Sequence, residues 1–184
     1  METNHPVLPA EFSPFLAASL LGAEPLAWLP AAEVPPPFHQ LLVHDHDMTS
    51  ELADFHGDSI RLKVLHSRQA GLLYFREVSL HAAASGTPVE YGLIEISLEV
   101  FPVSLRQLIL AEKLPFGTLL NDSGLAYRSE PQGFFTVPAD PLRAVFPQPS
   151  SGEILFGRYN HLVSGESTCL ARILEILPPI HHIE

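Results

Sequence analysis

The sequence predicts an α+β fold in which helices pack on a single antiparallel sheet. Segments with helical periodicity and segments with two-residue periodicity follow one another in blocks, in the order helices, strands, helices, strands. The strand segments are joined in pairs by short turns, which indicates hairpins. Single strands do not alternate regularly with helices, so a doubly wound parallel sheet is not expected.

The first 37 residues are rich in proline and alanine, and we interpret them as an N-terminal arm of a domain that spans 38–184. Within the arm, PFLAASLLG favours a short helix. LPAAEVPPPF favours a stiff connector, because each proline fixes its own backbone dihedral angle and restricts the preceding residue.

The domain is expected to begin with two short helices between about residues 37 and 56. A strand over SIRLKVLH follows, and GLLYFREVSLH and VEYGLIEISLEV then form a hairpin around the turn SGTP. FPVSLRQLILAEKL and PFGTLLND favour helical segments, and LAYRSEPQGFFTV favours short strands. EILFGRYNHLVSGESTCLARILEIL predicts a second hairpin that turns between Ser164 and Ser167.

Composition excludes several classes of function. The chain has 184 residues and a formal net charge of −11, which argues against electrostatic binding to nucleic acid or to an acidic membrane. Cys169 is the only cysteine, so no intrachain disulfide is possible. No apolar run reaches membrane-spanning length, and the N-terminus has no signal-peptide pattern. We therefore expect a cytoplasmic monomer or dimer.

The stretch LLVHDHDMTSELADFHG, residues 41–57, permits two interpretations. Histidine and aspartate are metal ligands, but His44 and His46 are two residues apart, whereas helical metal sites place their ligands three or four apart. The alternative is a corner between two helices, in which the Asp47 carboxylate caps the second helix. We favour the corner and expect no metal site.

Two charged residues interrupt otherwise apolar strand faces. Alternate residues of a strand share a face, which places Arg76 among Leu72, Tyr74, Val78 and Leu80, and Glu175 among Cys169, Ala171, Ile173 and Leu177. A buried ion without a partner costs several kcal/mol, so each requires one. Either Arg76 and Glu175 pair with each other or reach the sheet edge, or they line a cavity in which Arg76 holds a ligand carboxylate.

Four motifs, in the same order, resemble the chorismate pyruvate-lyase family. They are DMT at 47–49, YFREVSL at 74–80, LPFGTLL at 114–120, and LFGRYNHL followed by LEILPP near the C-terminus. The resemblance covers about Phe38 to Pro179. It implies an antiparallel sheet of about six strands, with helix-turn-helix flaps that enclose an internal cavity, and a cofactor-independent lyase that converts chorismate into 4-hydroxybenzoate and pyruvate.

The resemblance also implies roles for individual residues. Arg76 would bind the ring carboxylate, and Glu175 would lie near the product hydroxyl and move a proton, which makes these two the candidate catalytic residues. Contacts with the substrate would come from Met48, Thr49, Phe116, Gly117 and Arg158. The partner would be a small carboxylate, with no cofactor and no metal.

The sequence departs from the family pattern at two places. Phe116 stands where leucine is common, and Tyr91, Gly92 and Leu93 stand where the family has a small residue, glycine and then arginine. These departures indicate a related aromatic or cyclic acid as a possible substrate. The same fold also resembles the effector-binding domain of bacterial transcription regulators, so a non-catalytic protein that binds an aromatic acid is the alternative.

Overall fold

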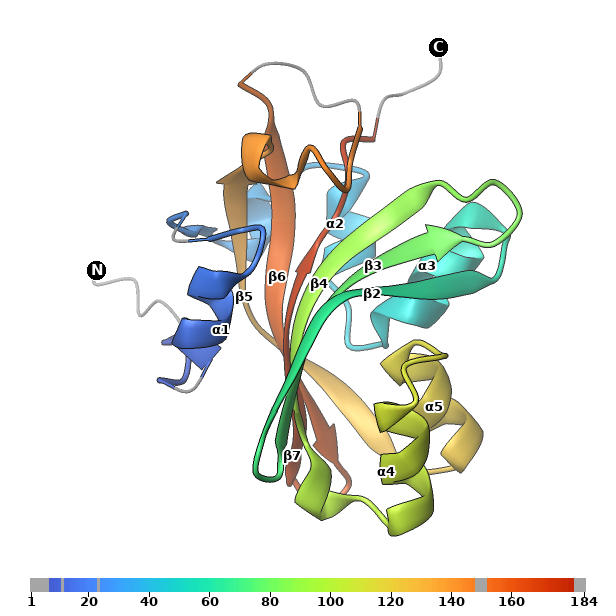
Figure 1. Cartoon of the computed structure of the whole chain (residues 1–184). Helices are drawn as coiled ribbons and strands as arrows, with labels where there is room; N and C mark the ends of the chain where they lie inside the picture. Colours follow the sequence, from blue (N-terminus) through green and yellow to red (C-terminus); the bar gives the residue numbers. More distant parts are fainter. Residues whose placement is uncertain (1–6, 11, 23, 148–151, 181–184) are drawn as a thin grey trace.

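The computed structural model describes residues 7–10, 12–22, 24–147 and 152–180. Its centre is one antiparallel sheet of seven strands in the order β1-β5-β6-β7-β4-β3-β2 (Figure 1). The strands are β1 Ala27–Leu29, β2 Ile60–Ala70, β3 Leu73–Ala82, β4 Pro88–Ser97, β5 Tyr127–Pro138, β6 Ile154–Ser164 and β7 Cys169–Ile176. The predicted α+β class with a single antiparallel sheet is confirmed.

Helices lie on both faces of this sheet. Within the described ranges, the α-helices are α1 Phe12–Ala18, α2 Phe38–Leu42, α3 Met48–His56, α4 Val103–Leu110 and α5 Phe116–Ser123. The short 3-10 helices there are η1 Ala31–Glu33, η2 Leu98–Val100 and η3 Asp140–Leu142. In Figure 1, α1 lies on one side of the sheet, and α3, α4 and α5 lie on the other. We call these the outer and the inner face.

The sheet has one strand more than the expected number of about six. The extra strand is β1, which comes from the N-terminal arm and pairs with β5, so that Trp28 lies opposite Phe135. The segment predicted to hold short strands is instead the single 12-residue strand β5, which has an irregularity between Pro131 and Gly133. Long-range pairing with β1 and β6 stabilises a continuous strand that the local sequence does not indicate.

The N-terminal arm contributes to the core of the sheet. Phe12 and Phe15 of α1 are buried in one apolar cluster with Tyr91 and Leu93 of β4. On the same face, the buried Glu77 carboxylate accepts a hydrogen bond from the backbone N–H of Leu20 (2.8 Å). Residues 1–6 of the arm lie outside the described residues, and a domain boundary at residue 37 stays a prediction.

The inner face carries two apolar clusters with polar residues between them. One cluster joins α2 and α3 to the sheet through Leu42, Met48 and Leu52. The other joins α4 and α5 to the sheet through residues such as Ile109 and Leu120. Among the described residues, no helix is long and apolar enough to cross a membrane.

Strand register places Arg76 and Glu175 on the inner face together, as the alternation of residues predicted. Arg76 of β3 lies opposite Ile94 of β4, which in turn lies opposite Ile173 of β7. Glu175 follows Ile173 by two residues, so both side chains project from the same face. The shared location of the two charges is therefore confirmed.

Candidate functional site

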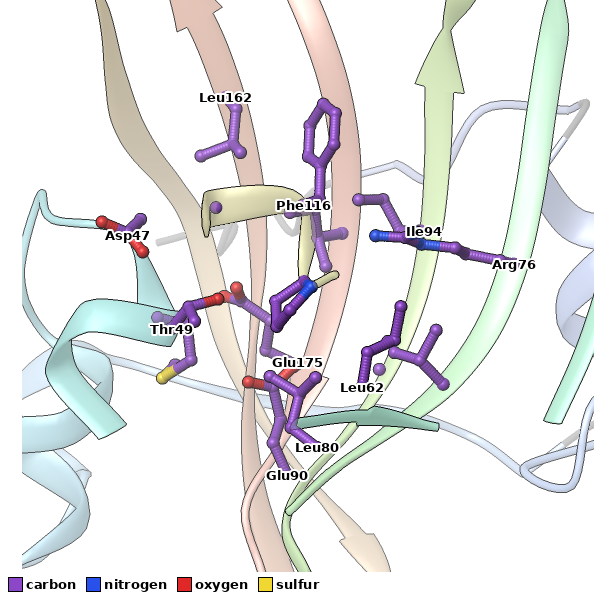
Figure 2. Close-up of a pocket in the computed structure, with 16 residues that line it drawn as sticks. Asp47, Thr49, Leu62, Arg76, Leu80, Glu90, Ile94, Phe116, Leu162 and Glu175 are labelled. Carbon is purple, nitrogen blue, oxygen red and sulfur yellow. The ribbon is translucent and has the colours of Figure 1, made fainter. Parts of the chain in front are cut away.

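A pocket lies between the inner face of the sheet and the N-terminal ends of α3 and α5 (Figure 2). Its volume is about 50 Å³, which is room for a few water molecules. Its walls are mostly apolar, with four ionisable side chains among them. The lining residues are Asp47, Met48, Thr49, Leu62, Arg76, Val78, Leu80, Glu90, Gly92, Ile94, Pro115, Phe116, Gly117, Leu162, Ile173 and Glu175.

Arg76 is a buried cation, and two of its three guanidinium nitrogens have no hydrogen-bond partner among the described residues. Its side chain comes from β3, and the residue is 1% exposed. Nε and Nη1 are buried and donate to no described residue. Burial lowers the pKa of Arg76 to about 10, although Tyr74 and Glu112 nearby oppose the change, so the group remains charged at neutral pH. A buried charge in this state is costly for folding, and it provides a ready site for an anion.

Glu175 pairs with Arg158, and not with Arg76. Arg158 of β6 lies directly opposite Glu175 of β7, and its Nε donates to the Glu175 carboxylate. Both residues are buried, and Arg158 is fully inaccessible to solvent. The alternative in which Arg76 and Glu175 neutralise each other is therefore wrong, because a neighbouring strand supplies a closer cation.

The remaining donors of Arg158 hold the corner between α2 and α3. Nη1 donates to the backbone carbonyls of Leu42 (3.2 Å) and His44 (3.3 Å), and Nη2 donates to the carbonyl of His46 (3.4 Å). The guanidinium thus joins two strands to the segment that leads into α3. Arg158 is not among the residues that line the pocket, so its predicted contact with a substrate stays a prediction.

The histidine-aspartate stretch is the corner that binds Arg158. His44 Nε2 lies 2.8 Å from the Leu41 carbonyl, to which it donates, so Nδ1 is the acceptor of the ring. Nδ1 accepts a hydrogen bond from the backbone N–H of His46 (3.2 Å) and lies 3.3 Å from Arg158 Nη1. Burial, followed by Arg158, lowers the pKa of His44, which is consistent with a neutral ring.

His44, His46 and Glu51 nevertheless lie close together. One potential ligand atom from each residue lies within 4.8 Å of the others. Both nitrogens of His44 already have partners, and one of these partners is the Arg158 cation. His46 Nδ1 lies 2.6 Å from the Glu51 carboxylate, which raises the pKa of His46. Ordinary hydrogen bonds account for the cluster, and the expected absence of a metal site stays a prediction.

The mouth of the pocket is formed by the first residues of α3 and α5. Asp47 caps α3 as predicted, because its carboxylate accepts the backbone N–H of Ser50 (3.0 Å). It also accepts a hydrogen bond from Asn121 Nδ2 of α5 (3.3 Å). The close approach of the helices requires Gly117, because a Cβ atom there would lie 2.6 Å from Asp47 Oδ1 and 3.0 Å from Thr49 Oγ1.

These helix ends give the mouth a positive character. The first backbone N–H groups of a helix have no partner within it, and the helix dipole is positive at that end. Met48 and Thr49 begin α3, while Phe116 and Gly117 begin α5, and all four line the pocket. The structure brings these predicted contact residues together with Arg76 and Glu175, whereas their roles in binding stay predictions.

Glu90 is a pocket residue that the sequence analysis missed. It is 4% exposed, and its Oε2 is buried with no hydrogen-bond partner among the described residues. Burial is the largest cause that raises the pKa of Glu90 well above its ordinary value, followed by the charge of Glu175. Strand alternation could have identified Glu90 in the sequence. It is a charged residue on the strand face that carries Gly92 and Ile94, just as Arg76 is a charged residue on the face that carries Val78.

One departure from the family pattern does not concern the pocket. Leu93 is fully buried in the outer-face cluster that contains Phe15 of α1, on the opposite side of the sheet from Gly92. An inference about the substrate from Leu93 is therefore wrong, because the residue packs against the N-terminal arm. Phe116, the other departure, does line the pocket.

Comparison with solved structures supports the chorismate lyase-like fold. PhnF from Mycobacterium smegmatis aligns with a TM-score of 0.55 and 12% identity, over 75% of this chain and 69% of that one. The effector domain of PhnF aligns with a TM-score of 0.54 and 11% identity, over 72% and 88% of the respective chains. The gene product SA0254 from Staphylococcus aureus aligns with a TM-score of 0.53 and 9% identity, over 74% and 90%.

At these identities the likeness establishes the fold alone. No protein-family model matches the sequence, and no curated protein sequence is significantly similar to it. The resemblance to chorismate pyruvate-lyases is thus supported at the level of the fold, which is shared with a domain described as an effector domain.

The two buried arginines predict opposite effects on stability. Arg76→Met removes an unpaired buried cation and keeps most of the side-chain volume, so the free energy of unfolding should rise by at least ~1 kcal/mol, or roughly 2–4 °C in melting temperature. Arg158→Met leaves Glu175 without its partner and releases the corner, so it should cost about 3–5 kcal/mol. Chemical denaturation measures both, and equal shifts in the same direction would refute the assigned roles.

Proposed function

We propose that this protein binds a small organic carboxylic acid in the inner-face pocket, and that Arg76 holds the carboxylate. The observation that carries the proposal is the buried guanidinium of Arg76, whose Nε and Nη1 have no partner among the described residues. A carboxylate would supply both an opposite charge and hydrogen-bond acceptors. Binding would thereby offset the free-energy cost of burying the Arg76 guanidinium away from water.

The walls of the pocket suit the apolar body of such an acid. Leu62, Val78 and Ile94 come from three neighbouring strands, and Phe116 covers them from α5. Burial of apolar ligand surface against these side chains would add about 25 cal/mol per Å² to the affinity, before the entropic costs of association. The helix N-termini at the mouth carry partial positive charge, which the Asp47 carboxylate offsets at α3.

Binding of a ring-sized acid requires the mouth to open. The pocket holds about 50 Å³, whereas small-molecule sites commonly span roughly 300–1,000 Å³. The contact that joins α5 to α3 through Asn121 consists of two long hydrogen bonds between exposed groups, from Nδ2 to the Asp47 carboxylate (3.3 Å) and to Ser50 Oγ (3.4 Å). Separation of the two helix ends at this contact is therefore the least costly route into the pocket, while the corner at Arg158 stays in place.

Binding without chemistry is the function that the observations support best. The effector domain of PhnF shares the fold, and an effector domain binds a ligand without needing to transform it. Arg158 also holds the Glu175 carboxylate in a buried ion pair, which leaves Glu175 less free to exchange a proton with a ligand. The proposal thus places this chain with proteins that sense or carry small acids.

Elimination of pyruvate from chorismate to give 4-hydroxybenzoate is the second candidate. It is favoured by the buried carboxyl groups of Glu90 and Glu175, because burial raises the pKa of both and a raised pKa suits a carboxyl that transfers a proton. In that reaction Arg76 would orient the ring carboxylate, and aromatisation of the ring would drive the elimination.

A direct assay separates the two candidates. Chorismate incubated with purified protein should yield no 4-hydroxybenzoate above the rate without protein, measured by ultraviolet absorbance after chromatography. Steady formation of product by the wild-type protein, and its loss in Glu175→Gln at a temperature at which that variant is folded, would establish the lyase in place of the binding protein.

The role of Arg76 predicts the effect of three variants on binding. Arg76→Met should weaken binding of benzoate by about 10–150-fold, the equivalent of a lost charged hydrogen bond of roughly 1.5–3 kcal/mol. Arg76→Lys should weaken it less, because the ammonium keeps the charge but loses the planar fork. Arg61→Ala, which removes an exposed arginine of the adjacent strand β2, is the control and should leave binding unchanged. Equal affinities for wild type and Arg76→Met in calorimetry would place the site elsewhere.

A further inference from the structure

The pocket has two polar ends that lie apart along the sheet. Arg76 is level with Ile94 in the register of β3 and β4, and Glu90 lies four residues from Ile94 along β4, opposite Leu80. Four residues of a strand span about 13 Å. Figure 2 shows Arg76 on one side of the pocket, and Glu90 and Glu175 together on another. A ligand held by Arg76 would therefore extend toward the carboxyl groups.

The end opposite Arg76 is acidic. Three carboxyl groups, those of Glu90, Glu175 and Asp47, line it, and the nearby cation is Arg158. Arg158 already pairs with Glu175 and donates its other hydrogen bonds to the corner between α2 and α3. This end therefore has carboxylate oxygens that can accept further hydrogen bonds. No unpaired cation among the described residues lies there to bind a second anion.

Glu90 is the group at this end that has a free atom. Its Oε2 is buried and has no partner among the described residues, whereas Glu175 is engaged with Arg158. Gly92 beside it has no side chain to fill the space, and a Cβ atom there would lie 3.0 Å from Glu90 Oε1. The carboxyl of Glu90 is thus available to a ligand atom that reaches this end of the pocket.

We propose that Glu90 determines which acids bind: it accepts those that carry a hydrogen-bond donor, an amine or a hydroxyl, at the end opposite the carboxylate, and it rejects those with a second carboxylate. The inference rests on the proposed function, because it requires the first carboxylate at Arg76. A hydroxyl donates to Oε2, and an ammonium group is both a donor and a counter-charge. A second carboxylate would lie beside Glu175 and Asp47 without a free cation, which is repulsive.

Proton release on binding distinguishes an ammonium ligand from a hydroxyl ligand at Glu90. Burial and the neighbouring Glu175 raise its pKa, while Arg158 opposes the change and Asp47 adds to it, so Glu90 holds a proton more tightly than an exposed glutamate does. An ammonium group would favour the ionised form, so Glu90 would release its proton to the solvent on binding. A hydroxyl needs no such release. Chorismate carries two carboxylates, so the inference also disfavours it as a ligand.

Calorimetry with four benzoates tests the inference: benzoate, 4-hydroxybenzoate, 4-(aminomethyl)benzoate and terephthalate. Wild type should bind the hydroxy or the aminomethyl acid at least about tenfold more tightly than terephthalate, or roughly 1.4 kcal/mol. Glu90→Gln, which keeps the size but cannot ionise and adds an N–H donor, should reduce that ratio about tenfold or more. It should leave the affinity for benzoate within about threefold.

Two controls keep the result specific. Glu95→Gln makes the same substitution on β4, at a buried glutamate of the outer face, and should leave the ratio unchanged. In wild type, the aminomethyl acid should release up to about one proton, as measured by repeating the calorimetry in buffers of different ionisation enthalpy, and benzoate should release none. This second measurement requires no variant to fold.

Failure of the inference can be told from failure of the proposed function. If benzoate binds through Arg76 but terephthalate binds wild type as tightly as the donor-bearing acids, Glu90 does not select the ligand. The same holds if Glu90→Gln leaves the ratio unchanged. If none of the four acids binds, or if all bind Arg76→Met as well as wild type, the proposed function is wrong and the inference is wrong with it.

Discussion

The guanidinium of Arg158 connects the sheet to the segment that shapes the pocket mouth. It neutralises Glu175 on the neighbouring strand and donates to carbonyls of the corner between α2 and α3. This corner leads directly to Asp47, which caps α3 and contacts Asn121 of α5. The position of both helix N-termini over the inner face thus depends on one buried cation and its partners.

Arg158 and Arg76 have different roles, and the difference explains why the pocket suits an anion. Nε, Nη1 and Nη2 of Arg158 all donate hydrogen bonds, so this arginine stabilises the fold. Arg76 is buried with two unpaired nitrogens, which lowers the free energy of unfolding. Residues that destabilise a fold in the absence of a ligand are commonly retained for function. Glu90 is a second group of this kind, since its Oε2 also lacks a partner. The two together define a pocket with one cationic and one acidic end.

Sequence reasoning succeeded where a local pattern determines the structure. Strand alternation placed Arg76 and Glu175 on one face, and capping rules identified Asp47 as the start of α3. It failed where the register between two strands, or pairing with a distant segment, decides the neighbour. The partner of Glu175 depends on the register of β6 against β7, and β1 joins the sheet only through pairing with β5. Leu93 packs in one cluster with residues of α1, a segment that the family resemblance did not cover.

The Glu90 carboxyl shows a different limit. Its position followed from alternation, but its significance depends on burial and on the lack of a partner, which no sequence pattern displays. The same applies to the histidine-aspartate stretch, whose residues have metal-ligand chemistry, whereas the fold uses the His44 ring and the backbone of the corner for hydrogen bonds around Arg158. Residue type thus indicated a polar site, and only tertiary packing showed which cation it surrounds.

The most direct measurement of the central claim is a crystal structure of the protein with benzoate. The account predicts the carboxylate within about 3 Å of guanidinium nitrogens of Arg76, with the ring between the sheet and Phe116 and the N-termini of α3 and α5 further apart than in the empty pocket. Benzoate bound at another place on the protein, with the guanidinium of Arg76 still unpaired, would contradict it.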